Sequence, residues 1–308
     1  MKAISYRRYG GPEVLEYGER PEPKVGPDAV LIRVKAAAVN PVDWKAQAGY
    51  LEPVLDAVFP VVPGWDVSGV VERPGPAVTE FRPGDEVIGY VREDFLSRGT
   101  CAEYVAAPIR TLARKPRNLS FEQAAGIPLA GLTAYQSLSR ALKVTEGDTV
   151  LVHAAAGGVG SMAVQLARHM GARVIGTASE RNHAYLRALG AEPTRYGEGL
   201  ADRVRALAPN GVDAVLDLIG GDALTASSAL LAPGGRLASI ADHAVLGLGG
   251  RYVFVRPDPD DLQDLTDLAE RGALGVEVAE IFPLQKTADA QRLSMAGHAR
   301  GKIAITVA

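Results

Sequence analysis

Cysteine is nearly absent from this chain of 308 residues, since Cys101 is its only cysteine. A single thiol cannot close an intramolecular disulfide, nor can it supply a zinc or iron–sulfur site built from several cysteines. Such cysteine usage is typical of a reducing compartment, and we place the protein in the cytoplasm. We expect Cys101 itself to be a small buried side chain rather than a reactive thiol.

A surplus of charge and long hydrophobic runs are also missing. Lys and Arg number 33 and Asp and Glu 36, so the net charge is −3, which offers no basic excess for nucleic acid or anionic lipid. The N-terminus, MKAISYRRYG, lacks the apolar segment of a signal peptide. No run approaches the roughly 20 apolar residues of a membrane span. We expect neither a nucleic-acid nor a membrane partner.

What the chain does contain is typical of a globular protein with two domains or one large one, because 47% of its residues are hydrophobic and 22% charged. Residues 1 to about 115 are punctuated by Pro and Gly between short β-type runs, which favours an irregular β domain. Residues 30–39 predict a half-buried strand, with Leu31, Arg33 and Lys35 on its outer face. Pro83 and Gly84 have the order required at the centre of a type II turn.

From residue 119 the pattern changes to helical spacing, interrupted by Pro128, and then to alternating strands and helices. Strands are predicted at 149–153, 173–177, 212–217 and 236–240, and helices at 158–170, 182–189, 200–207 and 223–231. The tail predicts a helix at 261–270 and a strand at 302–307. Strand–helix alternation with short connections indicates a doubly wound parallel sheet covered by helices on both faces. The fold class is therefore α/β.

A glycine-rich turn joins the first of these strands to its helix. Residues 155–160 (AAGGVG) match the dinucleotide pattern G-x-G-x-x-G at Gly157 and Gly160, with Ala155 in place of the first glycine. Gly157 has no Cβ to hold a pyrophosphate away, Gly160 permits close packing of helix and strand, and the helix N-terminus offers unpaired N–H groups. We prefer dinucleotide binding to a tight turn that binds nothing.

The second strand favours NADPH over NADH. An NAD site usually carries an acid at the end of this strand, and Ala178 stands there instead. Ser179 and Arg181 follow, and they can bond to and neutralise a 2′-phosphate. Glu180 opposes this assignment, and Arg181 has the alternative role of a solvated helix residue.

Several further blocks occur in a fixed order: NPVDWK (40–45), PGWDVSGVV (63–71), FRPGDEV (81–87), GTCAEY (99–104) and PLAGLTAY (128–135). With the glycine turn, they make the chain resemble the zeta-crystallin-like quinone oxidoreductase branch of the medium-chain dehydrogenase/reductase superfamily. The resemblance implies a GroES-like β domain at 1–118, completed by 252–308, and a Rossmann NADPH-binding domain at 119–251. It also implies a cofactor cleft between them and a homodimer.

The same resemblance assigns residues to the NADPH site, beginning with Asn40 and Thr133 near the nicotinamide. It implies cofactor contacts for Ala155, Gly157, Gly158, Val159, Gly160, Ser179, Arg181, Tyr196, Ile219, Gly220, Ile240, Ala241, Asp242, Phe254, Val255 and Arg256. Structural alternatives remain open: Asn40 as an Asx turn before Pro41, Thr133 as a helix hydroxyl bonded to its own backbone, and Tyr196 as a surface aromatic.

The chain departs from the zinc-dependent alcohol dehydrogenases of this superfamily. They hold the metal with a Cys near the end of an early strand and a His after the Pro-Gly block, where this chain has Asn40 and Trp65. Neither replaces thiolate or imidazole. The five histidines show no paired ligand spacing, and we expect His153, beside the glycine turn, to be packed or hydrogen-bonded. The sequence predicts no metal site.

Without a Lewis acid, the favoured acceptor is electron-poor and conjugated, because conjugation spreads the charge that hydride addition creates. We expect hydride transfer to a quinone or a small α,β-unsaturated carbonyl compound. No dedicated acid is required; Tyr50 is a candidate donor to the substrate oxygen, with an exposed loop tyrosine as the alternative. The competing hypotheses are an enoyl-thioester reductase of the same superfamily and a non-catalytic NADPH-binding sensor or structural protein.

Overall fold

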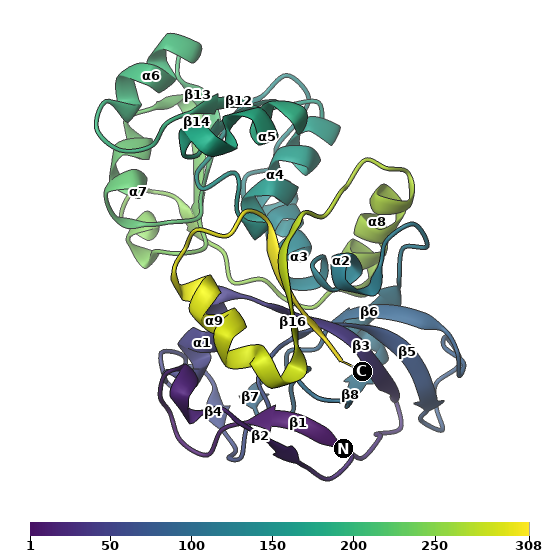
Figure 1. Cartoon of the computed structure of the whole chain (residues 1–308). Coiled ribbons are helices and arrows are strands. Elements are labelled where there is room, and N and C mark those ends of the chain that lie inside the picture. Colours follow the sequence, from purple (N-terminus) through teal and green to yellow (C-terminus); the bar gives the residue numbers. More distant parts are fainter. Residues whose placement is uncertain (308) are drawn as a thin grey trace. The chain divides into compact units, whose positions relative to one another are not determined.

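The computed structural model describes residues 1–307, which form two compact units (Figure 1). The first unit contains residues 1–129, 257–272 and the segment from Val276 onward. The second contains residues 130–256 and 273–275. Each unit is therefore assembled from segments that are distant in the sequence.

The first unit is built on a seven-stranded sheet in the order β16-β17-β3-β5-β6-β9, with β8 also paired to β3. Its strands are β3 (Ala29–Val39), β5 (Asp66–Pro74), β6 (Glu86–Tyr90), β8 (Tyr104–Pro108), β9 (Leu112–Arg114), β16 (Val278–Pro283) and β17 (Lys302–Thr306). The C-terminal β17 runs antiparallel to β3, with Ile303 opposite Val39 (Figure 1). Two small sheets, β1 (Lys2–Ser5) with β2 (Glu16–Glu19) and β4 (Asp56–Ala57) with β7 (Phe95–Leu96), complete the strands.

The central strand β3 is more buried than its alternation predicts. Leu31, expected on the outer face, is buried, and of the eleven residues only Arg33 is exposed. The reason is that Ala36 and Ala38 pack on Ala125 of helix α2 (Phe121–Ala125), so that a helix covers part of the second face. The prediction of a half-buried strand was wrong for this reason. The type II turn is confirmed, because Gly84 has a φ of +94° and Asp85 N donates to Arg82 O.

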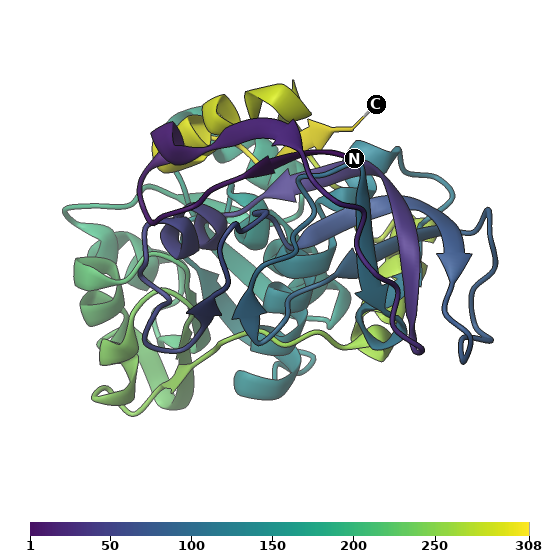
Figure 2. The ribbon, with the colours of Figure 1, turned by 90° about the horizontal axis from the view of Figure 1, so that it is seen from below.

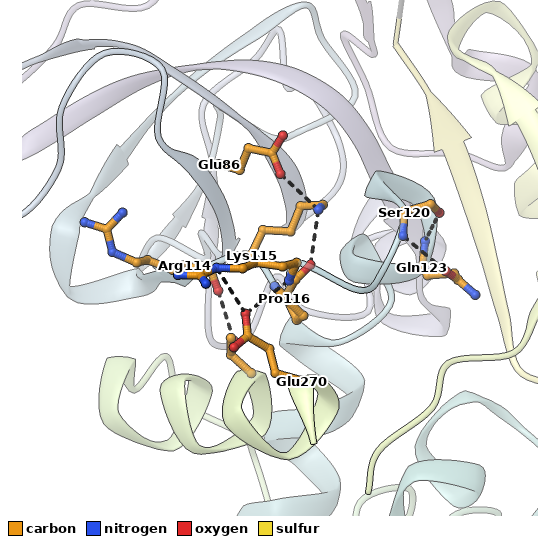
Figure 3. A network of polar contacts seen from close by, with 9 residues as sticks. Glu86, Arg114, Lys115, Pro116, Ser120, Gln123 and Glu270 are labelled. Carbon is orange, nitrogen blue, oxygen red and sulfur yellow. Dashed lines mark hydrogen bonds and ion pairs between the residues drawn. The ribbon is translucent and has the colours of Figure 1, made fainter. Parts of the chain in front are cut away.

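Three further helices belong to the first unit: α1 (Pro41–Gln47), α8 (Pro259–Glu270) and α9 (Thr287–Met295). Helix α9 lies beside the N-terminal segment of the chain (Figure 2). A polar network joins α8 to β9: the Thr266 hydroxyl donates to Arg114 O, and Glu270 accepts from Arg117 N (Figure 3). Beside it, the buried Lys115 ammonium donates to Glu86 (Figure 3). It also lies 4.9 Å from the centre of the Phe121 ring. These contacts connect the returning C-terminal segment to the β unit.

The second unit contains a six-stranded sheet in the order β12-β11-β10-β13-β14-β15, and every pairing in it is parallel. Its strands are β10 (Thr149–Val152), β11 (Arg173–Thr177), β12 (Glu192–Thr194), β13 (Val212–Asp217), β14 (Leu231–Ser239) and β15 (Arg251–Tyr252). The helices between them are α4 (Gly158–His169), α5 (His183–Ala188), α6 (Leu200–Leu207) and α7 (Gly221–Ser228). Counted within this unit the order is 3-2-1-4-5-6, the doubly wound order of dinucleotide-binding domains.

The core of the second unit follows from its sequence pattern. Strands β10 and β13 each contain three consecutive buried apolar residues, at 150–152 and 214–216, as expected for parallel strands covered on both faces. Leu151, Val215 and Leu237 pack with Val204 and Leu224 of the covering helices. Full burial of such a side chain contributes about 1.5–3 kcal/mol, so this cluster is a main source of the unit's stability.

Most predicted elements are present, and the differences have local causes. Helix α3 (Pro128–Gln136) starts at Pro128, which suits a first helical turn, and it continues as a π-helix at 137–141. Strand β14 begins at Leu231, where the sequence predicts the end of a helix. The sequence pattern predicts neither the helices α1 and α9 nor the strands β1, β2, β4, β7, β9, β12, β15 and β16. Among residues 1–307 no helix is long and apolar enough to cross a membrane. The predicted fold class, a GroES-like β domain with a Rossmann sheet, is confirmed.

Candidate active site

The glycine-rich turn lies between β10 and α4, with Gly157 as the N-cap of the helix. Ala154 has a φ of +47°, and Ala155 is fully buried. A Cβ at Gly160 would lie 2.3 Å from Ala154 O and 2.7 Å from Ala155 Cα, so only glycine allows this approach of helix and turn. The close packing predicted for Gly160 is present.

The start of α4 fits a diphosphate group. The first N–H groups of a helix, here those of Gly158, Val159 and Gly160, have no acceptor in the preceding turn. Gly157 supplies no side-chain cap to them. The nearest atom to a Cβ built at Gly157 is 3.4 Å away, so the turn is not packed against other groups there. Free N–H groups and the positive end of the helix dipole together suit an anion.

The residues predicted at the 2′-phosphate follow the next two strands. Ser179 caps the short helix that contains Arg181, and Ala178 N donates to Thr194 O at the end of β12. Tyr196, two residues beyond Thr194, is exposed. Glu180, the residue that opposes NADPH, pairs with Arg195 at 3.7 Å. Since both side chains are exposed, this pair is weak, but it brings a second arginine to the loop, one that the sequence analysis did not name.

The ends of β13 and β14 are held together by polar contacts. Asp217 accepts from the backbone N–H groups of Ile219 and Gly220, and the Ser239 hydroxyl donates to it at 2.5 Å. Ser239 also accepts from the amides of Ala241 and Asp242. These bonds fix the two predicted cofactor segments, 219–220 and 240–242, on neighbouring strand ends.

The predicted segment 254–256 follows β15 and is attached to α3. Gln136 donates to Arg256 O at 3.0 Å and accepts from Arg256 N at 3.2 Å. Thr133 is buried one turn earlier on the same helix. Val255 is buried, whereas Phe254 and Arg256 are exposed. The structure therefore connects the segment to the helix that carries Thr133.

All the predicted cofactor residues of the second unit except Thr133 follow carboxyl ends of strands in one parallel sheet. In an open α/β sheet this edge, at the point where strand order reverses, is where ligands bind. Here the reversal lies at β10, which precedes the glycine turn. His153, directly after β10, is buried and contacts the hydroxyl of Thr177 in β11 at 3.2 Å and that of Ser227 in α7 at 2.7 Å. It therefore connects β10 to β11 and to α7 near this edge of the sheet. Its packed and hydrogen-bonded role is confirmed.

In the first unit, Asn40 is the N-cap of α1, and only 3% of it is exposed. Its side-chain Nδ2 donates to Asp66 Oδ2 at 2.8 Å, and its Oδ1 accepts from the Lys302 ammonium. Lys302 Nζ lies 3.5 Å from Asp66 Oδ2, and Asp66 Oδ1 accepts from Leu129 N at 2.7 Å. The Asn40 side chain thus belongs to a buried charged network rather than to an Asx turn.

A second buried carboxyl group lies next to this network. Asp43 Oδ2 accepts from Asn40 N at 2.7 Å, while its Oδ1 has no hydrogen-bond partner. Burial raises the pKa of Asp43 to about 7, although the bond from Asn40 opposes the shift. Burial also raises the pKa of Asp66, against the influence of the Lys302 ammonium and the Asn40 amide. Asp43 is therefore the group whose charge changes near neutral pH.

Asp43 also lines a pocket of the first unit, with about 350 Å³ of empty space that includes its open mouth. Tyr6, Trp65 and Phe95 contribute aromatic walls, and Glu93 adds a carboxylate. Burial raises the pKa of Glu93, whose Oε2 has no partner. Its enclosed free volume is only about 20 Å³, room for about one water molecule, and both polar and apolar atoms line it.

Tyr50 and Cys101 occupy opposite environments. Tyr50, the candidate donor, lies in the turn after α1 and is 70% exposed. Cys101 is buried, as predicted, and burial raises the pKa of its thiol. A thiol held in the neutral form is a poor nucleophile, so Cys101 is part of the core.

The residues at the positions where zinc-dependent alcohol dehydrogenases hold their metal do not fit zinc. Asn40 is engaged by Asp66 and Lys302, and Trp65 has an indole in place of an imidazole. Within residues 1–307 no group of three or more His, Cys, Asp or Glu side chains is placed to hold a metal ion. No step of the chemistry below uses one.

Three residues of this site, Asp43, Asp66 and Lys302, were not assigned a role from the sequence. Asp43 and Asp66 stand inside the recognised blocks NPVDWK and PGWDVSGVV. Their position beside other motif residues is the signal that could have identified them as site residues. Lys302 begins an apolar strand, which is an unusual place for a buried ammonium.

Comparisons with known proteins agree with this architecture. The family model described as an alcohol dehydrogenase GroES-like domain matches residues 26–117, and the zinc-binding dehydrogenase model matches residues 158–252. An Arabidopsis thaliana NADPH-dependent alkenal/one oxidoreductase is 37% identical over 316 residues, covering 99% of this chain and 79% of the relative.

Two solved structures are similar along the whole chain. The quinone oxidoreductase from Coxiella burnetii has a TM-score of 0.89 and 37% identity, covering 100% of this chain and 99% of the other. A mycobacterial protein complexed with NADPH has a TM-score of 0.87 and 33% identity, covering 100% of both chains. The chain belongs to the medium-chain dehydrogenase/reductase superfamily. Within it, the chain is a member of the quinone oxidoreductase branch.

Proposed function

We propose that the protein is a zinc-independent, NADPH-dependent reductase of quinones or small α,β-unsaturated carbonyl compounds. The observation that carries the proposal is the free helix N-terminus at the glycine turn, located at the strand-order reversal of a 3-2-1-4-5-6 sheet. Relatives with the same architecture include an alkenal/one oxidoreductase and a quinone oxidoreductase. Asn40 and Trp65 at the metal positions favour an acceptor that needs no Lewis acid.

Each segment of the site has a task in this proposal. The amides of Gly158 and Val159 bind the pyrophosphate, and Ser179 and Arg181 bind the 2′-phosphate. NADPH, when bound, supplies a hydride to the acceptor. The 219–220 and 240–242 segments line the cofactor, and Thr133 and Asn40 lie toward its nicotinamide end. The first unit contributes the substrate site and the second the cofactor site.

Two further properties belong to the same proposal. We expect a homodimer, as the family resemblance implies, and sedimentation velocity would measure it. We also expect the protein to act in the cytoplasm on small molecules, without nucleic-acid or membrane partners, in keeping with its net charge of −3.

The test is a steady-state assay with quinones, alkenals and enoyl thioesters, each with NADPH and with NADH. We expect turnover of quinones or alkenals and a preference for NADPH. Arg181→Ala should weaken NADPH binding by about tenfold or more and leave NADH binding nearly unchanged, because a charged hydrogen bond contributes about 1.5–3 kcal/mol. Turnover confined to thioesters would favour the enoyl-thioester alternative. Tight NADPH binding without turnover of any acceptor would favour a sensor or structural protein.

A further inference from the structure

The amide of Asn40 is held by two groups of opposite hydrogen-bonding character. The Lys302 ammonium has only hydrogens to donate, and it bonds to Asn40 Oδ1. Asp66, as a carboxylate, has only lone pairs, and it accepts from Asn40 Nδ2 at 2.8 Å. If the oxygen and the nitrogen of the Asn40 amide exchanged places, the NH₂ group would face the Lys302 ammonium and the oxygen would face the Asp66 carboxylate. Neither pair could form a hydrogen bond. The side chain therefore has one permitted orientation.

The two holding groups are themselves fixed. Asp66 Oδ1 accepts from Leu129 N at 2.7 Å in the first turn of α3, and Asp66 Oδ2 lies 3.5 Å from Lys302 Nζ. Both side chains are buried, at 0% exposure for Asp66 and 4% for Lys302. The backbone of Asn40 is anchored separately, through its N–H to Asp43. The side-chain amide is thus held by two buried groups, and the backbone that carries it is held by a third.

This arrangement leaves one hydrogen of the amide unused. Asn40 Nδ2 carries two hydrogens, and Asp66 takes one of them. No side chain or backbone group among residues 1–307 accepts the other. A buried donor without an acceptor is costly, and such donors in native proteins are usually met by a ligand or an ordered water. This second N–H is the one hydrogen-bonding group of the Asn40 amide that the described residues leave unfilled.

We propose that Lys302 and Asp66 are positioning residues that aim the second Nδ2–H of Asn40 at the carbonyl oxygen of the acceptor. This inference rests on the proposed function and adds to it the group that stabilises the developing charge. A donor that is already oriented before the reaction needs no reorganisation as the charge appears, and this is the most effective form of electrostatic catalysis.

The step balances without any further reagent. Bound NADPH would supply the hydride, losing one C–H bond and being oxidised to NADP⁺. The hydride would form a new C–H bond at the electron-poor carbon of the acceptor, and the π electrons of the conjugated system would move to the carbonyl oxygen. Asn40 donates a hydrogen bond to that oxygen but loses no proton. The proton that completes the two-electron reduction comes from solvent.

Asn40→Asp is the first test, because it keeps the shape and the acceptor for Lys302 but removes the donor. We expect kcat to fall by about 10²–10³-fold, as when an oriented donor is removed from other enzymes. The loss should be larger for weakly activated alkenals than for strongly electron-poor quinones, whose own conjugation stabilises more of the charge. NADPH affinity, measured by fluorescence titration without acceptor, should fall by much less than kcat, since the acceptor's oxygen is absent. Asn118→Asp controls for the substitution, since the Asn118 amide donates to Ala269 O outside this network.

Lys302→Met tests positioning, because the amide then has no ammonium to orient it. We expect a lower kcat at nearly unchanged NADPH affinity, and the double variant Asn40→Asp/Lys302→Met should be no slower than Asn40→Asp alone. Lys302→Met leaves the buried negative charge of Asp66 without a positive partner, so this single variant could fail to fold. In that case the double variant Asp66→Asn/Lys302→Met is tested instead. It removes both charges and should fold with kcat still reduced.

Two results would overturn the inference while the proposed function stands. One is wild-type turnover that Asn40→Asp leaves intact. The other is a parallel loss of NADPH affinity and kcat, equal for all acceptors, which would make Asn40 a cofactor contact. Absence of wild-type turnover with every acceptor would instead refute the proposed function.

Discussion

Asp43 shows how burial changes the chemistry of one side chain. It is enclosed in the first unit, with Asp66 and Lys302 as its nearest charged neighbours, and burial raises its pKa from 3.8 to about 7. A group whose pKa is higher in the folded than in the unfolded state stabilises the fold at low pH, below its unfolded value. That contribution is lost as pH rises through the folded pKa. Asp66 has a raised pKa as well and acts in the same direction.

We therefore predict that Asp43→Asn removes part of the pH dependence of stability. Asparagine keeps the oxygen that accepts from Asn40 N but never becomes charged. Between about pH 4 and about pH 7 the free energy of unfolding of the wild type should fall relative to that of the variant. Urea unfolding at several pH values measures this difference. Parallel pH curves for the two proteins would contradict the prediction, and Asp28→Asn, at an exposed position, is the matched control.

For single residues, the sequence predicts which positions belong to the site better than it predicts which residues those positions contact. Asn40, Gly157 and Gly160 stand in motifs whose spacing has a physical reason, and the structure places them at a helix cap and a helix start. Lys302 has no such motif. Its partner Asn40 is 262 positions away, and no local pattern specifies that contact.

At the scale of elements, the strand–turn–helix unit β10–α4 is the feature that depends most on glycine. A Cβ at position 160 would lie 2.3 Å from Ala154 O, which is backbone and cannot rotate away. Gly160→Ala must therefore shift α4 relative to the turn.

We predict that Gly160→Ala lowers the free energy of unfolding by about 1–3 kcal/mol, the usual cost of overpacking. NADPH affinity should also fall, by about tenfold or more, because the first amides of α4 move with the helix. Chemical denaturation and fluorescence titration measure the two effects. Gly247→Ala is the matched control in the same unit, since its Cβ would be 3.5 Å from the nearest atom. Unchanged NADPH affinity in Gly160→Ala would show that these amides do not bind the cofactor.

The sequence predicts long, strongly patterned elements and misses short or edge ones. Strands β10, β11 and β13 are largely buried and have apolar centres, so their positions follow from composition. Strands β12 and β15 have three and two residues, too few for a period to be visible. Helix α1 was missed although Asn40, Pro41 and Asp43 are good N-terminal residues, because seven residues show little amphipathic pattern.

At the scale of the whole molecule, the N-terminal and C-terminal segments of the chain belong to the same unit. Strand β17 pairs with β3, and Lys302 at its start reaches the N-terminal network of Asn40 and Asp66. Neither the pairing nor the network follows from local pattern. The resemblance to a known family predicted the return of the C-terminal segment, which periodicity alone did not.

For the whole protein, we propose that a nicotinamide cofactor bound at the start of α4 reduces a conjugated acceptor without a metal ion. The most direct measurement is acceptor-dependent NADPH oxidation by protein treated exhaustively with a chelator, with its metal content determined on the same sample. We predict that the rate is unchanged by chelation and that no stoichiometric zinc is found. Activity that disappears on chelation and returns on addition of zinc would contradict the account.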